Sequence, residues 1–146
     1  MVVGIAASGR TPFVWGALDA ARVARAKTVL VSFNPNLRFP RGLRPDVVLA
    51  PRLGPEVLTG STRLKAGTAT KILLNLFTTL AMVRLGKVVE NLMVDVRPSN
   101  AKLRDRAVRI VRTLTGAAEA AARRALEQSG WVVKRALRRL RGGQAD

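Results

Sequence analysis

The chain has 146 residues, 48% of them hydrophobic, which is enough for the core of an ordinary domain and excludes a disordered polypeptide. It contains no cysteine and no histidine, which excludes disulfide and thiolate chemistry and removes the usual metal ligands and general base, so acid–base chemistry would rest on carboxylates or lysine. The net charge is +17, but tyrosine is absent and the few aromatic residues are isolated, so nucleic-acid binding is not expected.

The first stretch, "VVGIAASGRTPF", predicts a buried strand, a tight turn, and a helix with proline near its first position. In such a turn, backbone N–H groups at the helix N-terminus face an anion, and Ser8 and Thr11 could add hydroxyl donors. Alternatively, Ser8 or Thr11 only caps the helix. The residues leave both interpretations open.

The next elements alternate in type. A helix is expected over 11–26, a continuous apolar strand in "KTVLVSF" and, after a loop over 34–45, a short strand in "DVVLAP". Apolar strands separated by a helix are typical of a parallel sheet in an α/β fold.

The segment Gly54–Lys71 carries glycine, proline, one glutamate, several hydroxyl residues and two kinds of basic residue ahead of an apolar helix. An N-cap is expected within Thr59–Ser61, with a helix running to about Leu85 and stopping at Gly86. The hydroxyl and basic groups either bind a ligand or serve as caps and surface charges.

The longest apolar run, 72–83, contains Asn75 and two threonines, and no signal peptide is recognisable, so a soluble cytoplasmic protein without membrane contact is expected. The connector "VENLMVDVRPSN" could hold a short helix. The simplest explanation for Asn91, Asp95 and Asn100 in this connector is that they form turns and helix caps. Helices over 101–116, 117–128 and 130–141 would form a small bundle, followed by a disordered tail.

Four blocks together, "VVGIAASGRTPF", "GPEVLTGSTRLKAGTATKILLN", "AMVRLGKVVENLMVDV" and "SNAKLRDRAVRIVRTLTG", resemble the N-acetylmuramic acid 6-phosphate etherases, in the same order. The second block resembles the signature that this family shares with the glucokinase regulatory protein. The resemblance covers nearly the whole chain and only the second half of such an enzyme.

The resemblance implies part of a flavodoxin-like parallel sheet, with the three strands as the third to fifth of a sugar isomerase-type domain, followed by a small helical bundle. It places the domains at 1–97 and 98–146. The edge of the first strand would then face a missing half of the sheet, so homodimerisation or pairing with a complementary N-terminal half is expected.

The resemblance also implies lyase chemistry, in which the lactyl ether of the sugar phosphate is cleaved to N-acetylglucosamine 6-phosphate and D-lactate during cell-wall sugar recycling. Two carboxylates suffice for the proton transfers, so no metal or organic cofactor is expected. The family's catalytic glutamates would lie upstream of Met1, which leaves Glu56 as a weak candidate for acid or base.

By resemblance, the substrate-binding residues lie in two motifs. Glu56 could instead pair with Arg63 or accept backbone N–H groups, and Arg10 could contact the ligand or pair with a carboxylate. A non-catalytic sugar-phosphate-binding regulatory module, or a remnant, is the alternative to the enzyme. The expected ligand is a phosphorylated amino sugar, bound by Ser8, Gly9, Arg10, Thr11, Glu56, Ser61, Thr62, Arg63 and Lys65.

Overall fold

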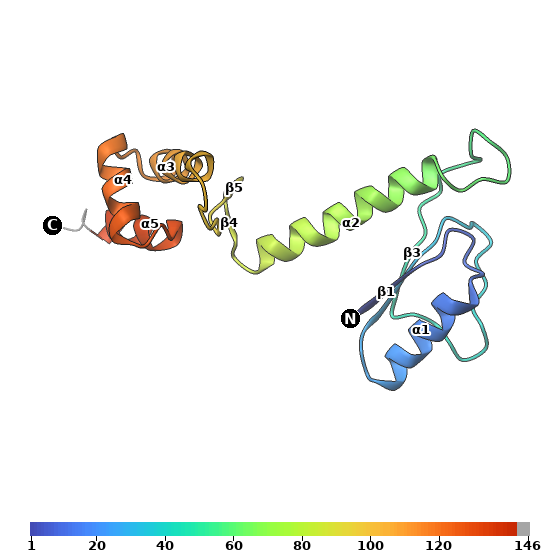
Figure 1. The fold of residues 1–146 in the computed structure, drawn as a ribbon. Helices are drawn as coiled ribbons and strands as arrows, with labels where there is room; N and C mark the ends of the chain where they lie inside the picture. Colours follow the sequence, from blue (N-terminus) through green and yellow to red (C-terminus); the bar gives the residue numbers. More distant parts are fainter. Residues whose placement is uncertain (143–146) are drawn as a thin grey trace. The chain divides into compact units, whose positions relative to one another are not determined.

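The computed structural model describes residues 1–142, so the expected disordered tail lies outside the described residues. The chain forms two compact units, Met1–Leu76 and Phe77–Asp146, each with its own set of internal contacts. The elements are α/β in type, as predicted, and follow one another along the chain in Figure 1. The domain boundary expected after residue 97 stays a prediction, as does the flavodoxin-like completion of the sheet.

The first unit contains a parallel sheet of β1 (Val2–Ile5), β2 (Thr28–Val31) and β3 (Val47–Leu49), in the order β1-β2-β3. All four residues of β2 are buried, whereas β1 is an edge strand. Helix α1 (Pro12–Val23) packs on β1 through Leu18, and a β carbon on Gly4 would stand 2.7 Å from Val14. Glycine therefore allows the close approach of helix to strand.

Asp46 fixes the start of β3 against β2. Its carboxylate accepts hydrogen bonds from the Thr28 backbone N–H at 2.8 Å, the Thr28 hydroxyl at 2.7 Å and Lys27 Nζ at 3.1 Å. The Thr28 hydroxyl in turn accepts from the Asp46 N–H at 3.0 Å. These bonds, those from Thr28 first, hold the pKa of Asp46 well below its usual range.

Helix α2 (Lys65–Arg84) begins after the stretch Thr59–Ser61 in which the sequence predicted its N-cap. Of its twenty residues only Ala66 is buried. By length and composition alone α2 could also cross a membrane, whereas the sequence led us to expect no membrane contact. One such helix is weak evidence for a membrane protein.

The second unit holds a small hairpin and a helical bundle. The hairpin pairs β4 (Val88–Val89) with antiparallel β5 (Leu92–Met93), in place of the short helix expected as an option for this connector. The bundle consists of α3 (Ala101–Thr115), α4 (Glu119–Gln128) and α5 (Val133–Gly142). Its apolar core includes the fully buried residues Val111, Leu126 and Val133.

Asn100 begins α3 as an N-cap, since its side-chain oxygen accepts a hydrogen bond from the Leu103 N–H at 2.9 Å. Gly116 ends the helix with a φ of 71°, a left-handed conformation that glycine adopts without steric cost. The cap role predicted for Asn100 is therefore confirmed, and Asp95 is paired with Lys87 at 2.7 Å.

Candidate functional site

The turn between β1 and α1 carries the first group of expected site residues. Gly9 has a φ of 69°, and its N–H donates to the Ala6 carbonyl at 2.8 Å. A β carbon there would overlap the Leu37 side chain and lie 3.2 Å from Ser32 Oγ. The turn thus requires glycine both for its conformation and for the space it leaves.

The hydroxyl groups of this turn are not used to cap α1. Thr11 is the N-cap residue, but its side chain accepts no capping hydrogen bond, and Pro12 follows at the first helical position. Ser8 Oγ accepts only a long bond, 3.3 Å, from the Arg10 N–H. The interpretation that these hydroxyls merely cap the helix is therefore wrong, and both side chains are exposed.

Arg10 is also exposed and forms no ion pair with any residue between 1 and 142. The alternative role for Arg10, an ion pair with a carboxylate, is therefore absent from the described residues. The turn therefore presents a guanidinium and two hydroxyl groups around a helix N-terminus, a combination of groups that suits an anionic ligand.

The second group of expected residues lies just before and at the start of α2. The carboxylate of Glu56 accepts hydrogen bonds from the backbone N–H groups of Lys65 at 2.9 Å and Ala66 at 3.0 Å. The bonds from Ala66 and Lys65 lower the pKa of Glu56 below its usual value. Glu56 therefore accepts hydrogen bonds from backbone N–H groups, and it does not pair with Arg63.

The glutamate thus caps α2 from nine residues upstream and closes the segment 57–64 into a loop. Ser61 in this loop is half-buried, and Thr62, Arg63 and Lys65 are exposed. Within residues 1–142 none of these four side chains has a hydrogen-bond or ion-pair partner, and no such contact joins this loop to the turn Ser8–Thr11. Both groups belong to the first unit.

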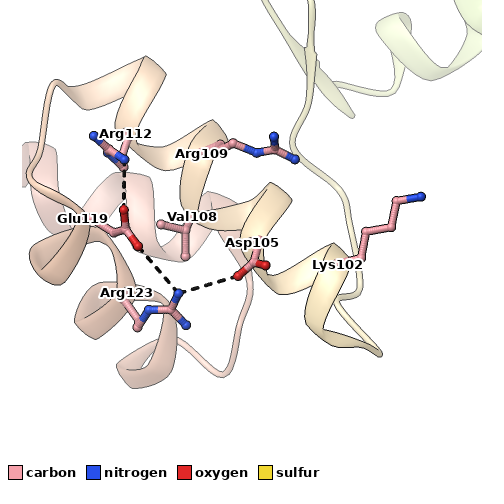
Figure 2. Close-up of a pocket in the computed structure, with 7 residues that line it drawn as sticks. All are labelled: Lys102, Asp105, Val108, Arg109, Arg112, Glu119 and Arg123. Carbon is pink, nitrogen blue, oxygen red and sulfur yellow. Dashed lines mark hydrogen bonds and ion pairs between the residues drawn. The ribbon is translucent and has the colours of Figure 1, made fainter.

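A basic pocket in the second unit was not expected from the sequence. Figure 2 shows its lining residues on α3 and α4. The pocket has a volume of about 520 Å³ and is open to solvent. Glu119 pairs with Arg112 at 3.1 Å and with Arg123 at 3.8 Å, and Asp105 pairs with Arg123 at 3.6 Å. Its seven lining residues are Lys102, Asp105, Val108, Arg109, Arg112, Glu119 and Arg123.

Lys102 and Arg109 in this pocket have no ion-pair partner in the described chain. The spacing of charged residues along 102–112 is the one sequence feature that could have predicted this pocket. The same spacing is, however, typical of the solvated face of an amphipathic helix, so it does not indicate a pocket by itself. Because the paired side chains are about half exposed, their ion pairs add little stability. Within residues 1–142, no three or more aspartate or glutamate side chains come together in a group that could hold a metal ion.

Comparison with known proteins gives one family model and a set of close relatives. The family model, the C-terminal lid domain of glucokinase regulatory protein, matches residues 90–141. A protein of Symbiobacterium thermophilum is 54% identical over 98% of this chain and 47% of its own length, and one of Serratia proteamaculans is 56% identical over 94% and 46%. A protein of Rhizobium rhizogenes is 53% identical over 94% and 44%.

Each of these three relatives is named an N-acetylmuramic acid 6-phosphate etherase. The chain spans about half the length of the curated relatives it matches. The resemblance inferred from its motifs is therefore confirmed over almost all of its residues.

Proposed function

The chain belongs to the N-acetylmuramic acid 6-phosphate etherase family and corresponds to the C-terminal half of its members, and from this premise we propose that it is the substrate-binding C-terminal portion of such a lyase. The observation that carries the proposal is an identity of more than half over nearly the whole chain to proteins with that name. The ligand is then a phosphorylated amino sugar, and the protein is cytoplasmic.

The two groups of exposed residues supply the binding contacts. In the turn after β1, the Arg10 guanidinium and the hydroxyls of Ser8 and Thr11 are open to a phosphate or to sugar hydroxyls. In the loop before α2, Ser61 and Lys65 face the ligand, with Thr62 and Arg63 beside them. Charged donors to phosphate form stronger hydrogen bonds than neutral donors, so Arg10, Arg63 and Lys65 contribute most.

The elimination of lactate needs a base for the C2 proton and an acid for the leaving oxygen. Glu56 is already held by two backbone N–H groups, and its lowered pKa makes it a weak base. We therefore place the catalytic carboxylates in the half of the etherase outside this chain, and give Glu56 the role of shaping the substrate loop. The sheet β1-β2-β3 would be completed by strands of that half, giving the flavodoxin-like order.

The test is D-lactate release from N-acetylmuramic acid 6-phosphate. The chain is assayed alone and mixed with a separately expressed N-terminal half of the Symbiobacterium thermophilum relative. We expect release only in the mixture. Release by the chain alone would contradict the placement of the catalytic carboxylates outside this chain. If the two halves are shown to be folded and associated and still release no lactate, the proposal that this chain is part of an etherase is wrong.

A second candidate is a non-catalytic module that binds sugar phosphates and regulates another protein. The match of residues 90–141 to the lid domain of a regulatory protein favours it. Binding of N-acetylglucosamine 6-phosphate by the chain, together with no lactate release in any mixture, is the outcome that would select this candidate over the enzyme.

A further inference from the structure

We propose that Trp15, Ser32 and Asn34 are positioning residues that hold the turn after β1 in its ligand-binding shape. The inference rests on the proposed function of that turn. Trp15 Nε1 donates to the Gly9 carbonyl at 2.9 Å, Asn34 Nδ2 donates to the Ser8 carbonyl at 2.9 Å, and Ser32 Oγ donates to the Ala7 carbonyl at 3.2 Å. Three side chains thus bind three consecutive carbonyl groups.

Each bond fixes one peptide plane. A peptide group is planar, so the orientation of the carbonyl of one residue sets the N–H of the next. Holding the carbonyls of residues 7, 8 and 9 therefore sets the N–H groups of Ser8, Gly9 and Arg10. The peptide planes on both sides of Ser8 are then fixed, and with them the direction in which its side chain leaves the backbone.

The donors are themselves held in place. Trp15 is 8% exposed, packs in the core with Leu18 and Leu30, and meets Phe39 edge to face at 6.2 Å between ring centroids. Ser32 is fully buried. Asn34 Oδ1 accepts from the Asn36 N–H at 2.9 Å, which fixes the amide that donates to Ser8. The three donors come from α1 and from the residues just after β2, which are separate parts of the first unit.

Because the turn is already ordered before the ligand arrives, binding does not cost the conformational entropy of ordering it, and the affinity is higher. A turn that contains a glycine and exposed polar side chains would otherwise sample many conformations. The donors therefore act on the ligand through the turn and do not touch it.

The test uses the full chain labelled with ¹⁵N and two variants that each remove one donor. Trp15→Phe keeps an aromatic ring in the core and removes the indole N–H. Asn34→Asp keeps the oxygen that Asn36 needs and removes the amide donor. Trp131→Phe and Asn36→Asp are the matched controls, since neither side chain donates a hydrogen bond in the described part of the chain.

Hydrogen exchange of the Gly9 amide is measured first, without ligand, so that the charge added by Asn34→Asp has no phosphate to repel. Losing one such bond should speed this exchange about fivefold in both variants, while the amides of β2 and the controls stay unchanged. Unchanged exchange at Gly9 in both variants would overturn the proposal.

Titration with N-acetylglucosamine 6-phosphate follows. We expect shifts at Ser8–Thr11 in the unaltered chain and in Trp131→Phe, and a Kd raised about three- to tenfold in Trp15→Phe, measured at a temperature at which both forms are fully folded. Equal Kd values in Trp15→Phe and in the unaltered chain would overturn the proposal. If no form of the chain binds the sugar phosphate, the proposed function fails, whereas the exchange of Gly9 still decides whether the three side chains hold the turn.

Discussion

Glu56 illustrates how one residue satisfies a local requirement from a distance. The first N–H groups of a helix have no partner inside the helix and need an acceptor. The hydroxyl residues nearest to α2 could have supplied it, yet the carboxylate of Glu56 does so, with two bonds of 2.9 and 3.0 Å. A negative charge at this end also interacts favourably with the helix dipole. The hydroxyls of the loop are thereby left open to other partners.

Replacing this carboxylate should loosen the start of α2. We expect Glu56→Ala to accelerate hydrogen exchange of the Lys65 and Ala66 amides and to lower the melting temperature by a few degrees, and Glu56→Gln to have a smaller effect because one acceptor remains. Glu127→Gln is the control, since Glu127 is exposed and has no side-chain partner within residues 1–142. Unchanged exchange at Lys65 and Ala66 in Glu56→Ala would contradict the cap.

The same contact should respond to pH. Because the fold lowers the pKa of Glu56 from its ordinary 4.5, the folded state favours the charged form. The stability from this contact is therefore fully present above pH 4.5 and is lost as the pH falls through the lowered pKa. Exchange at Lys65, corrected for its intrinsic pH dependence, should accelerate over that range in the unaltered chain and not in Glu56→Gln.

At the scale of elements, the bundle in the second unit is formed by three short amphipathic helices whose ends are fixed by identifiable residues. α3 begins at the Asn100 cap and stops at Gly116, and the apolar stripes of α3, α4 and α5 meet in one core. Helices of ten to fifteen residues are marginal in isolation, so caps and shared core contacts supply their stability.

Asn100→Ala should therefore destabilise the bundle by about 1 kcal/mol, the usual cost of an N-cap, while Asn100→Asp should stay near the unaltered chain. Urea unfolding followed by fluorescence in a Trp15→Phe background measures this, because Trp131, which packs against the bundle core, is then the only reporter. Asn36→Ala serves as a control for amide removal elsewhere. A free energy of unfolding for Asn100→Ala equal to that of the background would show that the cap contributes nothing.

For the whole molecule, the prominent feature is apolar surface that is exposed to solvent. Along α2 the exposed fractions of Ile72, Leu76 and Leu80 are 53%, 51% and 57%, and β1 is an edge strand of its sheet. Apolar helix faces and open strand edges favour association with another chain. The net charge of +17 opposes non-specific clustering, so a defined partner fits better than bulk aggregation.

We therefore expect the isolated chain to self-associate, and sedimentation velocity over a concentration series to give species above 15.8 kDa. The double variant Ile72→Glu with Leu80→Glu should shift the distribution toward the monomer. Phe13→Glu, which removes a residue exposed to 83% on α1, should leave the distribution unchanged. A monodisperse monomer at all concentrations would refute this prediction.

The sequence by itself determined the features that depend on neighbours along the chain. The apolar run of β2, the proline at the start of α1, the Asn100 cap and the spacing of apolar residues in α3 each reflect contacts within a few residues, so pattern and residue type suffice. The motif Gly54–Lys71 likewise indicated the family, which the relatives confirm.

Only the tertiary structure decided the features that join distant residues. The sequence placed the start of α2 too early, because local capping rules cannot foresee a carboxylate that reaches the helix from nine residues upstream. The hairpin of β4 and β5, the ion pairs between α3 and α4, and the three side chains behind the turn at Gly9 depend on backbone paths that bring separated segments together. Residue types allow such contacts, but the fold of the chain selects which of them form.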